Sequence, residues 1–292
     1  MYNRSKWCPP SVMQIFDLTT EFPSHLQIGM APKNIIWRLS MTQSQTPHFG
    51  FPEDDINLGR IINGKEATPH SAPYIVSLKR GINGSHFCGG SLIQPNWVLT
   101  AAHCLTRNTY IVAGLHNRNE DKDAQTIKVI ENFGHESYTG GVGPYDIALL
   151  KLENSVELND KVQLIELPED ENQQTGEGIL FGWGRDNPSG GGLPKNLMTV
   201  TTDLLPYDEC KEKLPKDAPI HSTNICSSSR DEKISACNGD SGGPLIKKYD
   251  DKVVQVGVVS WGYVPCGQRN YPSVYTHTGS HLKWLKSQMP EF

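Results

Sequence analysis

Cysteines constrain the fold of this chain more than any other feature of its sequence. Six of its seven cysteines lie after residue 80, and none stands in a Cys-x-x-Cys pair that would indicate zinc or a redox site. An even number of cysteines in one stretch is typical of a disulfide framework, which persists in oxidising compartments. The sequence therefore predicts three disulfides and a secreted protein, with buried free thiols as the alternative. The six are Cys88, Cys104, Cys210, Cys226, Cys237 and Cys266.

Residues 1–60 differ in composition from the rest of the chain. They are rich in Pro, Ser, Thr and Gln, show no helical or strand periodicity, and end near the acidic residues 52–55. We predict a largely unstructured leader that also carries Cys8, the odd cysteine. Prolines and charged residues interrupt the apolar segment of roughly 7–15 residues that a secretory signal needs, so no signal peptide is recognisable.

Downstream of this leader the pattern changes to short β-branched and aromatic runs, such as residues 74–76 and 147–150, separated by Gly, Pro, Asn and Asp. Regularly spaced short strands indicate an all-β sandwich or barrel. Leu282 and Leu285 recur at helical spacing near the end, which predicts a short C-terminal helix. Because no internal repeat is present, residues 61–292 are predicted to form one compact unit.

The charge and apolar patterns argue against two classes of partner. The net charge of −5 is mild, and no Lys/Arg-rich run is present that could follow phosphates or an anionic membrane. No stretch reaches the ~20 consecutive apolar residues that a membrane helix needs. We therefore expect a soluble protein that binds neither nucleic acid nor membrane.

Three segments carry residue types suited to nucleophilic catalysis. A hydroxyl attacks a peptide carbonyl only if a base removes its proton, and that base needs a third group to fix its tautomer. His103 follows an apolar run and precedes a cysteine, and Asp146 stands at the mouth of the apolar stretch 147–150. A buried carboxylate needs a hydrogen-bonded partner, which predicts contact between Asp146 and His103.

The third segment, residues 238–244 (NGDSGGP), places Ser241 among clustered glycines. Glycines leave the backbone free to turn its N–H groups towards one point. We expect the amides of Gly239 and Ser241 to form an oxyanion hole, where losing one donor typically costs ~2.7–4 kcal/mol of transition-state stabilisation.

Residues 100–104 (TAAHC), 146–149 (DIAL) and 239–244 (GDSGGP), in this order and at these separations, resemble the chymotrypsin/trypsin family of serine endopeptidases. Residues 260–262 (SWG) add a fourth match, and the resemblance covers residues 61–292. It implies a precursor with an all-β fold: two six-stranded antiparallel β-barrels packed together, with the active site between them and a short C-terminal helix.

The same resemblance implies roles for individual residues. His103 is implied to be the general base and then acid, Asp146 its orienting partner, and Ser241 the nucleophile. It also implies the disulfide pairings, which use all six late cysteines. These pairings are Cys88 with Cys104, Cys210 with Cys226, and Cys237 with Cys266.

Activation of a precursor is implied by residues 60–64 (RIING), which resemble the junction that the family cleaves after a basic residue. An activating trypsin-like protease would cut between Arg60 and Ile61, and the new amino group would pair with Asp240. His86 resembles the position that holds this aspartate in some uncut precursors, although a plain surface imidazole is equally compatible with the sequence.

The specificity pocket is predicted from residues on both sides of Ser241. Ser235 stands where trypsin-like members carry an aspartate, so a buried Arg or Lys of the substrate would lack a counter-charge. Gly262 leaves room for large side chains, and Ser273 is expected to narrow the floor. We predict cleavage after Leu, Phe, Tyr or Met by a chymotrypsin-like or elastase-like member, with a preference for small residues as the alternative. The remaining predicted substrate-binding residues are Ser260 and Trp261.

No metal or cofactor is predicted, because Leu115 stands where a calcium ligand is usual in the family. Residues 83–85 (NGS) fit an N-glycosylation acceptor at Asn83. We expect a monomer whose partners are polypeptide substrates and protein protease inhibitors. The alternative function is that of a catalytically silent homologue acting as a binding or regulatory protein.

Overall fold

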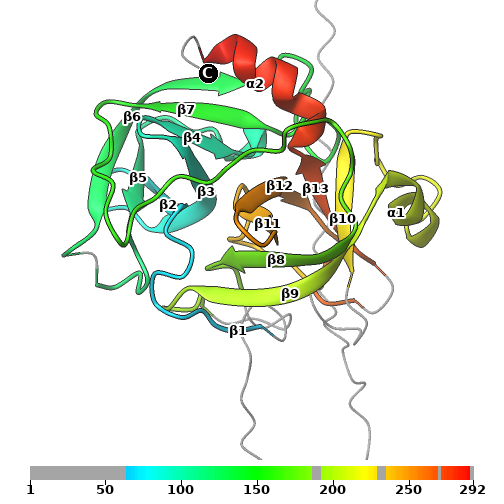
Figure 1. Cartoon of the computed structure of the whole chain (residues 1–292), viewed down its shortest axis with the longest axis horizontal. Helices are drawn as coiled ribbons and strands as arrows, with labels where there is room; N and C mark the ends of the chain where they lie inside the picture. Colours follow the sequence, from blue (N-terminus) through cyan, green and yellow to red (C-terminus); the bar gives the residue numbers. More distant parts are fainter. Residues whose placement is uncertain (1–63, 121, 186–191, 229–234, 269–270, 290–292) are drawn as a thin grey trace, which may run out of the picture. The chain divides into compact units, whose positions relative to one another are not determined.

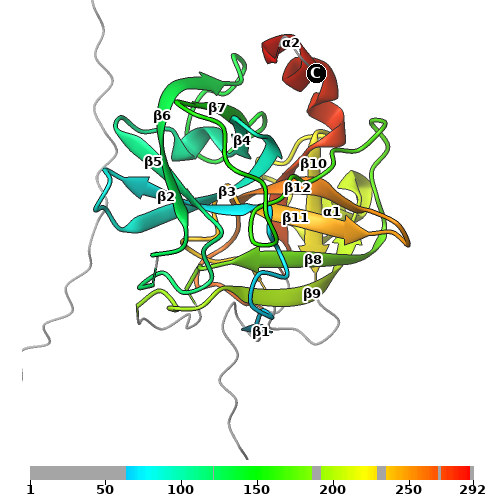
Figure 2. The same cartoon turned by 60° about the vertical axis from the view of Figure 1, so that its left-hand side comes forward.

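Two closed β-barrels form the body of the computed structural model, which describes residues 64–289 apart from 121, 186–191, 229–234 and 269–270. All strand pairings within the barrels are antiparallel, and the two barrels lie side by side in Figures 1 and 2. The predicted pair of six-stranded barrels is therefore confirmed. The leader and the junction at Arg60 and Ile61 lie outside the described residues.

The first barrel closes in the order β2-β3-β4-β7-β6-β5. Its strands are β2 (Ile75–Arg80), β3 (His86–Gln94), β4 (Trp97–Thr100), β5 (Thr109–Ala113), β6 (Gln125–Gly134) and β7 (Ala148–Leu152). The second barrel follows the order β9-β10-β13-β12-β11-β8, and pairing of β8 with β9 closes it. Its strands are β8 (Gly176–Gly182), β9 (Met198–Leu205), β10 (Asn224–Ser228), β11 (Pro244–Lys248), β12 (Val253–Trp261) and β13 (Ser273–His277). A further short strand, β1 (Lys65–Glu66), pairs with β9.

Helices are few and short among the described residues. They are α1 (Tyr207–Lys213), α2 (Leu282–Gln288) and the 3-10 turns η1 (Ala102–Cys104) and η2 (Gly279–His281). Helix α2 is the predicted C-terminal helix, and it buries Trp284 and Leu285 in the same apolar cluster as the first barrel. Neither α-helix is long and apolar enough to cross a bilayer.

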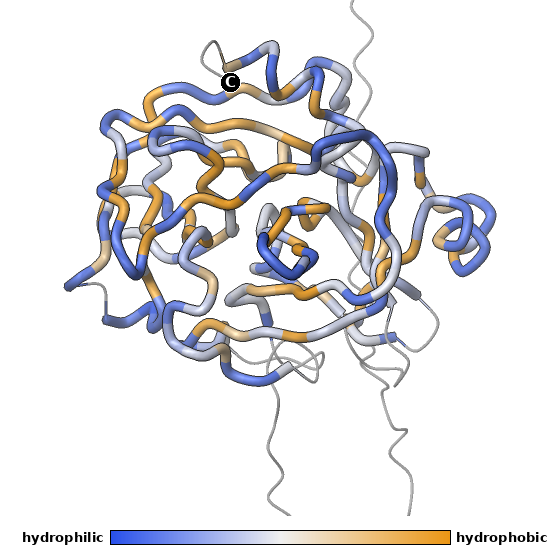
Figure 3. Tube along the Cα trace, in the orientation of Figure 1, coloured by the Kyte–Doolittle hydropathy of each residue, from blue (hydrophilic) through white to orange (hydrophobic). Residues whose placement is uncertain are grey.

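Burial of β-branched and aliphatic side chains inside each barrel explains why these short runs become strands. Leu78, Leu99 and Ile111 are fully buried in the first barrel, as are Leu245 and Val256 in the second. Figure 3 shows apolar residues gathered along the strands, whereas α1 is mostly hydrophilic. Burying one such side chain contributes about 1.5–3 kcal/mol, so the cores supply the main stabilisation of both barrels.

Glycine contacts and a buried polar pair are among the links between the two barrels. The Gly89 amide of β3 donates to the Ser241 carbonyl over 2.8 Å. The Ser91 hydroxyl donates to Gln255 Oε1 over 2.5 Å, and both side chains are fully buried. Gly242 has a left-handed φ of 77°, and a Cβ there would lie 2.2 Å from Thr100 Oγ1. The turn that carries Ser241 thus packs directly on the end of β4.

We expect Gly242→Ala to damage this contact. The new methyl group would collide with Thr100 and force a left-handed alanine, so the free energy of unfolding should fall by about 2 kcal/mol or more. Urea unfolding measures the change. The matched control is Gly192→Ala, because a Cβ at Gly192 meets nothing within 4 Å. Equal stability of the two variants would show that the turn does not pack as described.

Candidate active site

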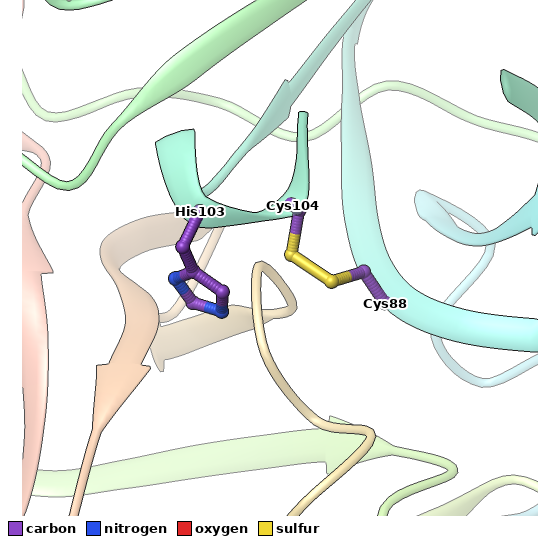
Figure 4. A group of neighbouring side chains, drawn as sticks. All are labelled: Cys88, His103 and Cys104. Carbon is purple, nitrogen blue, oxygen red and sulfur yellow. A yellow bond between two sulfur atoms is a disulfide. The ribbon is translucent and has the colours of Figure 1, made fainter. Parts of the chain in front are cut away.

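His103 lies in the 3-10 turn η1, directly after β4. The neighbouring Cys104 forms a disulfide with Cys88 of β3, as Figure 4 shows, so this turn is tied to the barrel wall. The imidazole keeps 30% of its surface exposed, whereas its partner Asp146 is only 2% exposed. The Nδ1 edge of the ring is therefore held by Asp146, and the rest of the ring remains accessible.

The Asp146 carboxylate is the polar centre of this region. Its Oδ1 accepts the His103 backbone amide over 2.9 Å, and its Oδ2 accepts His103 Nδ1 over 2.7 Å. Ser260 Oγ donates a third hydrogen bond to Oδ2 over 2.6 Å. These donors offset the cost of burying a carboxylate, as the sequence reasoning required. The contact predicted between Asp146 and His103 is present.

Backbone conformation at Tyr145 directs Asp146 inward. Tyr145 has a φ of 63°, which is uncommon for a residue other than glycine, and its carbonyl accepts the Ile147 amide over 2.8 Å. Thr276 Oγ1 of β13 donates to the Asp146 carbonyl over 2.8 Å. The sequence reasoning missed both residues, as well as the role of Ser260 as a ligand of Asp146.

Ser241 lies on a glycine-rich turn between the barrels. Gly239 has a φ of 104°, and the Ser241 carbonyl is held by the Gly89 amide. Within the described part of the chain, the amides of Gly239 and Ser241 donate to no other group, so they are available to an oxyanion. No hydrogen bond joins Ser241 to the His103 ring here, and such contacts often tighten only when substrate binds.

Asp240 is fully buried beside this turn. It accepts the Gly184 amide over 2.7 Å and the Cys237 amide over 2.9 Å. Burial raises the pKa of its carboxyl to about 6, which these two amides partly offset. His86 does not bind it: the His86 Nε2 lies 2.9 Å from the Gly239 carbonyl, and Ser77 Oγ lies 2.8 Å from its Nδ1.

A cavity of about 200 Å³ opens beside Ser241. None of the described residues that line it is charged. The lining consists of Ala236, Cys237, Asn238, Ser241, Val259, Ser260, Trp261, Gly262, Tyr263, Val264 and Cys266. The sequence predicted Ser260, Trp261 and Gly262 as lining residues, but it did not predict their neighbours in residues 236–238 and 263–266. A Cβ at Gly262 would meet only Ser273 Cα at 4.0 Å, so this wall is open.

Ser235 and Ser273, which the sequence predicts to form the base of the pocket, lie next to this lining rather than among its residues. Both are buried. The Ser235 hydroxyl accepts the Gly267 amide over 2.7 Å, and the Ser273 hydroxyl accepts the Ala236 amide over 3.1 Å. Each serine therefore positions the backbone that forms the cavity wall.

All three predicted disulfides are confirmed: Cys88–Cys104, Cys210–Cys226 and Cys237–Cys266. They fit an oxidising compartment. In the part of the chain that the structure describes, the group of side chains close enough to share a metal ion is Cys88, His103 and Cys104. Both of its sulfurs are bonded to one another, so this group offers no thiolate ligands.

Histidines and aromatic rings surround Tyr145 on its outer side. The His135 ring stacks on Tyr145 at 4.9 Å and lies 5.1 Å from the ring of His281. His281 is 3% exposed, and its Nε2 has no hydrogen-bond partner. Burial lowers the pKa of His281 to about 3, with further contributions from His135, His277 and His221. These packed rings support the turn that presents Asp146.

Comparisons with known proteins agree with this geometry. The Trypsin family model matches residues 61–285. Lectizyme of Glossina austeni is 46% identical over 254 residues, which cover 83% of this chain and 89% of that protein. Trypsin of Sus scrofa is 34% identical, covering 81% of this chain and 97% of its own length. Trypsin-1 of Astacus astacus is 35% identical, covering 78% and 99%.

Paired barrels, a His–Asp pair at their junction and a serine on a glycine-rich turn define a serine hydrolase of peptide bonds. Together with the family match, they show that the chain belongs to the trypsin family and is a serine endopeptidase. Polypeptide substrates and protein inhibitors follow from membership of this family.

His281 predicts a pH-dependent stability. Its pKa is about 3 in the folded chain against 6.5 for a free histidine, so below pH 6.5 the unfolded chain binds more protons. The free energy of unfolding should therefore fall as the pH drops from 6.5 towards 3, by up to about 1.4 kcal/mol per pH unit from this group. Urea unfolding at pH 7 and pH 5 should show a smaller loss for His281→Phe than for the wild type. Identical losses would contradict this assignment.

Proposed function

We propose that this chain is the precursor of a secreted serine endopeptidase that cleaves after Leu, Phe, Tyr or Met. Ser241 is the nucleophile, His103 the general base and acid, and Asp146 the group that orients His103. The observation that supports these roles best is the 2.7 Å contact between His103 Nδ1 and Asp146 Oδ2, beside the turn of Ser241.

In the acylation step, the ring nitrogen of His103 that does not contact Asp146 acts as the base. Because Nδ1–H donates to Asp146, the neutral ring carries its lone pair on Nε2, on the accessible side. Nε2 takes the proton of Ser241 Oγ as this oxygen forms a bond to the carbonyl carbon of the substrate. The buried carboxylate stabilises the imidazolium that results.

The remaining steps return the same proton. The carbonyl oxygen becomes an oxyanion and accepts hydrogen bonds from the amides of Gly239 and Ser241. When the intermediate collapses, the C–N bond breaks and His103 gives its proton to the departing amine. Water then attacks the acyl-enzyme with His103 again as base, which releases the acid and restores Ser241.

Substrate preference is proposed from the uncharged cavity beside Ser241. A guanidinium or ammonium group entering it would lose hydration without gaining a carboxylate among the described lining residues, which is costly. An apolar side chain has no charged group to dehydrate, and it gains contact with Val259 and Trp261. The preference thus differs from cleavage after Arg or Lys even though two of the relatives cited above are called trypsins.

Activation is proposed to occur by cleavage between Arg60 and Ile61, carried out by a trypsin-like protease. The fully buried Asp240 accepts two amide hydrogen bonds, and its raised pKa shows that burial of its charge is incompletely compensated. A new α-amino group would supply the positive charge that compensates the Asp240 carboxylate, next to the oxyanion amides. Its pairing with Asp240 is what we propose turns the enzyme on.

The remaining features of the proposal concern the whole chain. Residues 1–60 are proposed to act as a leader and residues 61–292 as the protease domain. The three disulfides support secretion into an extracellular space. The enzyme is proposed to act as a monomer without a cofactor or required metal, and the exposed Asn83 is proposed as its glycosylation site.

Activation and the nucleophile can be tested together. Trypsin treatment of the purified precursor should yield a new N-terminus at Ile61 and should turn on peptide hydrolysis. Ser241→Ala should be cut in the same way but should lose roughly 10⁵-fold or more in kcat, because no other group replaces the hydroxyl. Ser137→Ala, at an exposed serine, is the matched control and should keep full activity.

Hydrolysis that survives Ser241→Ala would refute the assigned nucleophile. Full activity before cleavage at residue 60 would refute the activation mechanism. Correct cleavage of the wild type without any hydrolysis would favour a silent homologue that binds proteins.

Substrate preference can be measured on a series of peptide anilides that end in Phe, Leu, Ala or Arg. The activated enzyme should favour Phe and Leu over Arg by roughly 100-fold in kcat/KM, because the cavity offers no counter-charge. Ser235→Asp should narrow this ratio by admitting Arg. A wild-type enzyme that prefers Arg would overturn the proposal, and one that prefers Ala would favour the small-residue alternative.

A further inference from the structure

Two Asn–Gly pairs lie within the described residues, Asn83–Gly84 and Asn238–Gly239. Both asparagines are exposed. Such pairs are chemically labile, because glycine carries no side chain to shield its nitrogen, which can then attack the side-chain amide of the asparagine before it. The second pair lines the specificity cavity and leads directly into the oxyanion turn. The hydrolysis described above uses the Gly239 amide but gives no role to the Asn238 side chain.

The two pairs differ in the hydrogen bonding of the glycine nitrogen. The Gly84 amide donates to the Gly81 carbonyl over 2.9 Å, within the hairpin between β2 and β3. The Gly239 amide donates to no group among residues 64–289 as far as they are described, and its role as an oxyanion donor requires it to stay available. One nitrogen is therefore engaged in a turn, whereas the other is free until substrate binds.

The fold requires glycine at position 239. Its φ of 104° is a conformation that other residues rarely adopt. A Cβ there would also lie 3.0 Å from Leu193 Cδ2 and 3.1 Å from Gly184 Cα. A larger residue would be strained and crowded, so the architecture itself keeps an unshielded nitrogen next to Asn238.

Backbone hydrogen bonds on either side of this peptide set what an attack requires. The Arg185 amide donates to the Asn238 carbonyl over 2.8 Å, and the Asp240 amide donates to the Cys237 carbonyl over 2.9 Å. To bring the Gly239 nitrogen to the side-chain carbonyl carbon of Asn238, the peptide between them must rotate and release the bond from Arg185. One backbone hydrogen bond contributes little net free energy, so this rotation at an exposed residue is accessible.

We propose that Asn238 is a site of spontaneous deamidation in which the Gly239 nitrogen is the nucleophile, so that each modified molecule loses an oxyanion donor and its activity. The enzyme would thus carry a chemical limit to its own lifetime. The loss of activity rests on the proposed function, because it requires the Gly239 amide to act as an oxyanion donor, whereas the deamidation itself does not.

The reaction needs only water as a co-reactant. The Gly239 nitrogen loses its proton and bonds to the side-chain carbonyl carbon of Asn238. The bond from this carbon to Nδ2 breaks, and ammonia leaves with a proton, which gives a cyclic imide. Water then opens the imide at either carbonyl and yields aspartate or isoaspartate. In total, one water is consumed and one ammonia is released, and nothing is oxidised or reduced.

Each product disfavours the oxyanion. In the imide, the Gly239 nitrogen carries no hydrogen to donate. Isoaspartate adds a carbon atom to the main chain and therefore displaces the turn before Ser241. Aspartate restores the main chain but places a carboxylate beside the negative charge that develops in the transition state. Removing one oxyanion donor typically lowers kcat by roughly 10²–10³-fold, so modified molecules should be nearly silent.

The chemistry is measured in Ser241→Ala, which cannot digest itself. This variant is made in a host that adds no N-glycans, because a glycan on Asn83 would protect the comparison residue. After activation with trypsin and inhibition of the trypsin, it is incubated at pH 7 and at pH 9, and peptide mapping by mass spectrometry follows both asparagines. Asn238 should convert to aspartate and isoaspartate faster than Asn83, and faster at pH 9, because the nitrogen must lose its proton.

The loss of function is measured on a Phe anilide. Activated wild type should lose activity per intact chain in proportion to the fraction of Asn238 converted. Asn238→Gln should keep its own starting activity over the same time, because the longer side chain forms a cyclic imide far more slowly. Asn83→Gln is the matched control, and it should lose activity as fast as the wild type.

Conversion of Asn83 as fast as that of Asn238 would overturn the inference while leaving the proposed function intact. Decay of Asn238→Gln at the wild-type rate, or full activity of molecules whose Asn238 has been converted, would also overturn it. A wild type that is inactive from the start would instead refute the proposed function, and the mapping of Ser241→Ala would still test the deamidation.

Discussion

The buried carboxylate of Asp146 is the interaction on which the rest of this active site depends. A charge at 2% exposure is tolerated only because three donors converge on it, from the backbone and ring of His103 and from Ser260. The same bonds that satisfy the carboxylate fix the ring and its tautomer. The cost of burying a charge is thereby coupled to the geometry that catalysis requires.

Placing Ser241 beside this pair requires the two barrels to approach closely. Glycines make the approach feasible, since a side chain at Gly242 would overlap Thr100 and one at Gly89 would come within 3.0 Å of Gly243. The disulfide Cys88–Cys104 fixes the turn of His103 on one side of the junction. On the other side, the left-handed turn at Gly239 leaves amides unpaired among the described residues. The positions of the catalytic groups thus depend on the packing between the two barrels.

Much of this arrangement could be predicted from the sequence, because it depends on residue types in short segments. The two barrels and the disulfide pairings were implied by the family resemblance that these motifs carry, and the pairing of His103 with Asp146 was expected because a buried carboxylate needs a partner. Other features depend on tertiary packing that no local pattern encodes. The Ser260 hydroxyl donates to Asp146, and the hydroxyls of Ser235 and Ser273 accept backbone amides next to the cavity wall.

Covalent labelling with a fluorophosphonate tests the central claim most directly, because this reagent reacts with a serine only when a neighbouring base and oxyanion donors activate its hydroxyl. Peptide mapping by mass spectrometry after activation should find one adduct per chain, on Ser241, and His103→Ala should abolish it. An adduct on another serine, or labelling of Ser241 that persists without His103, would contradict the arrangement described.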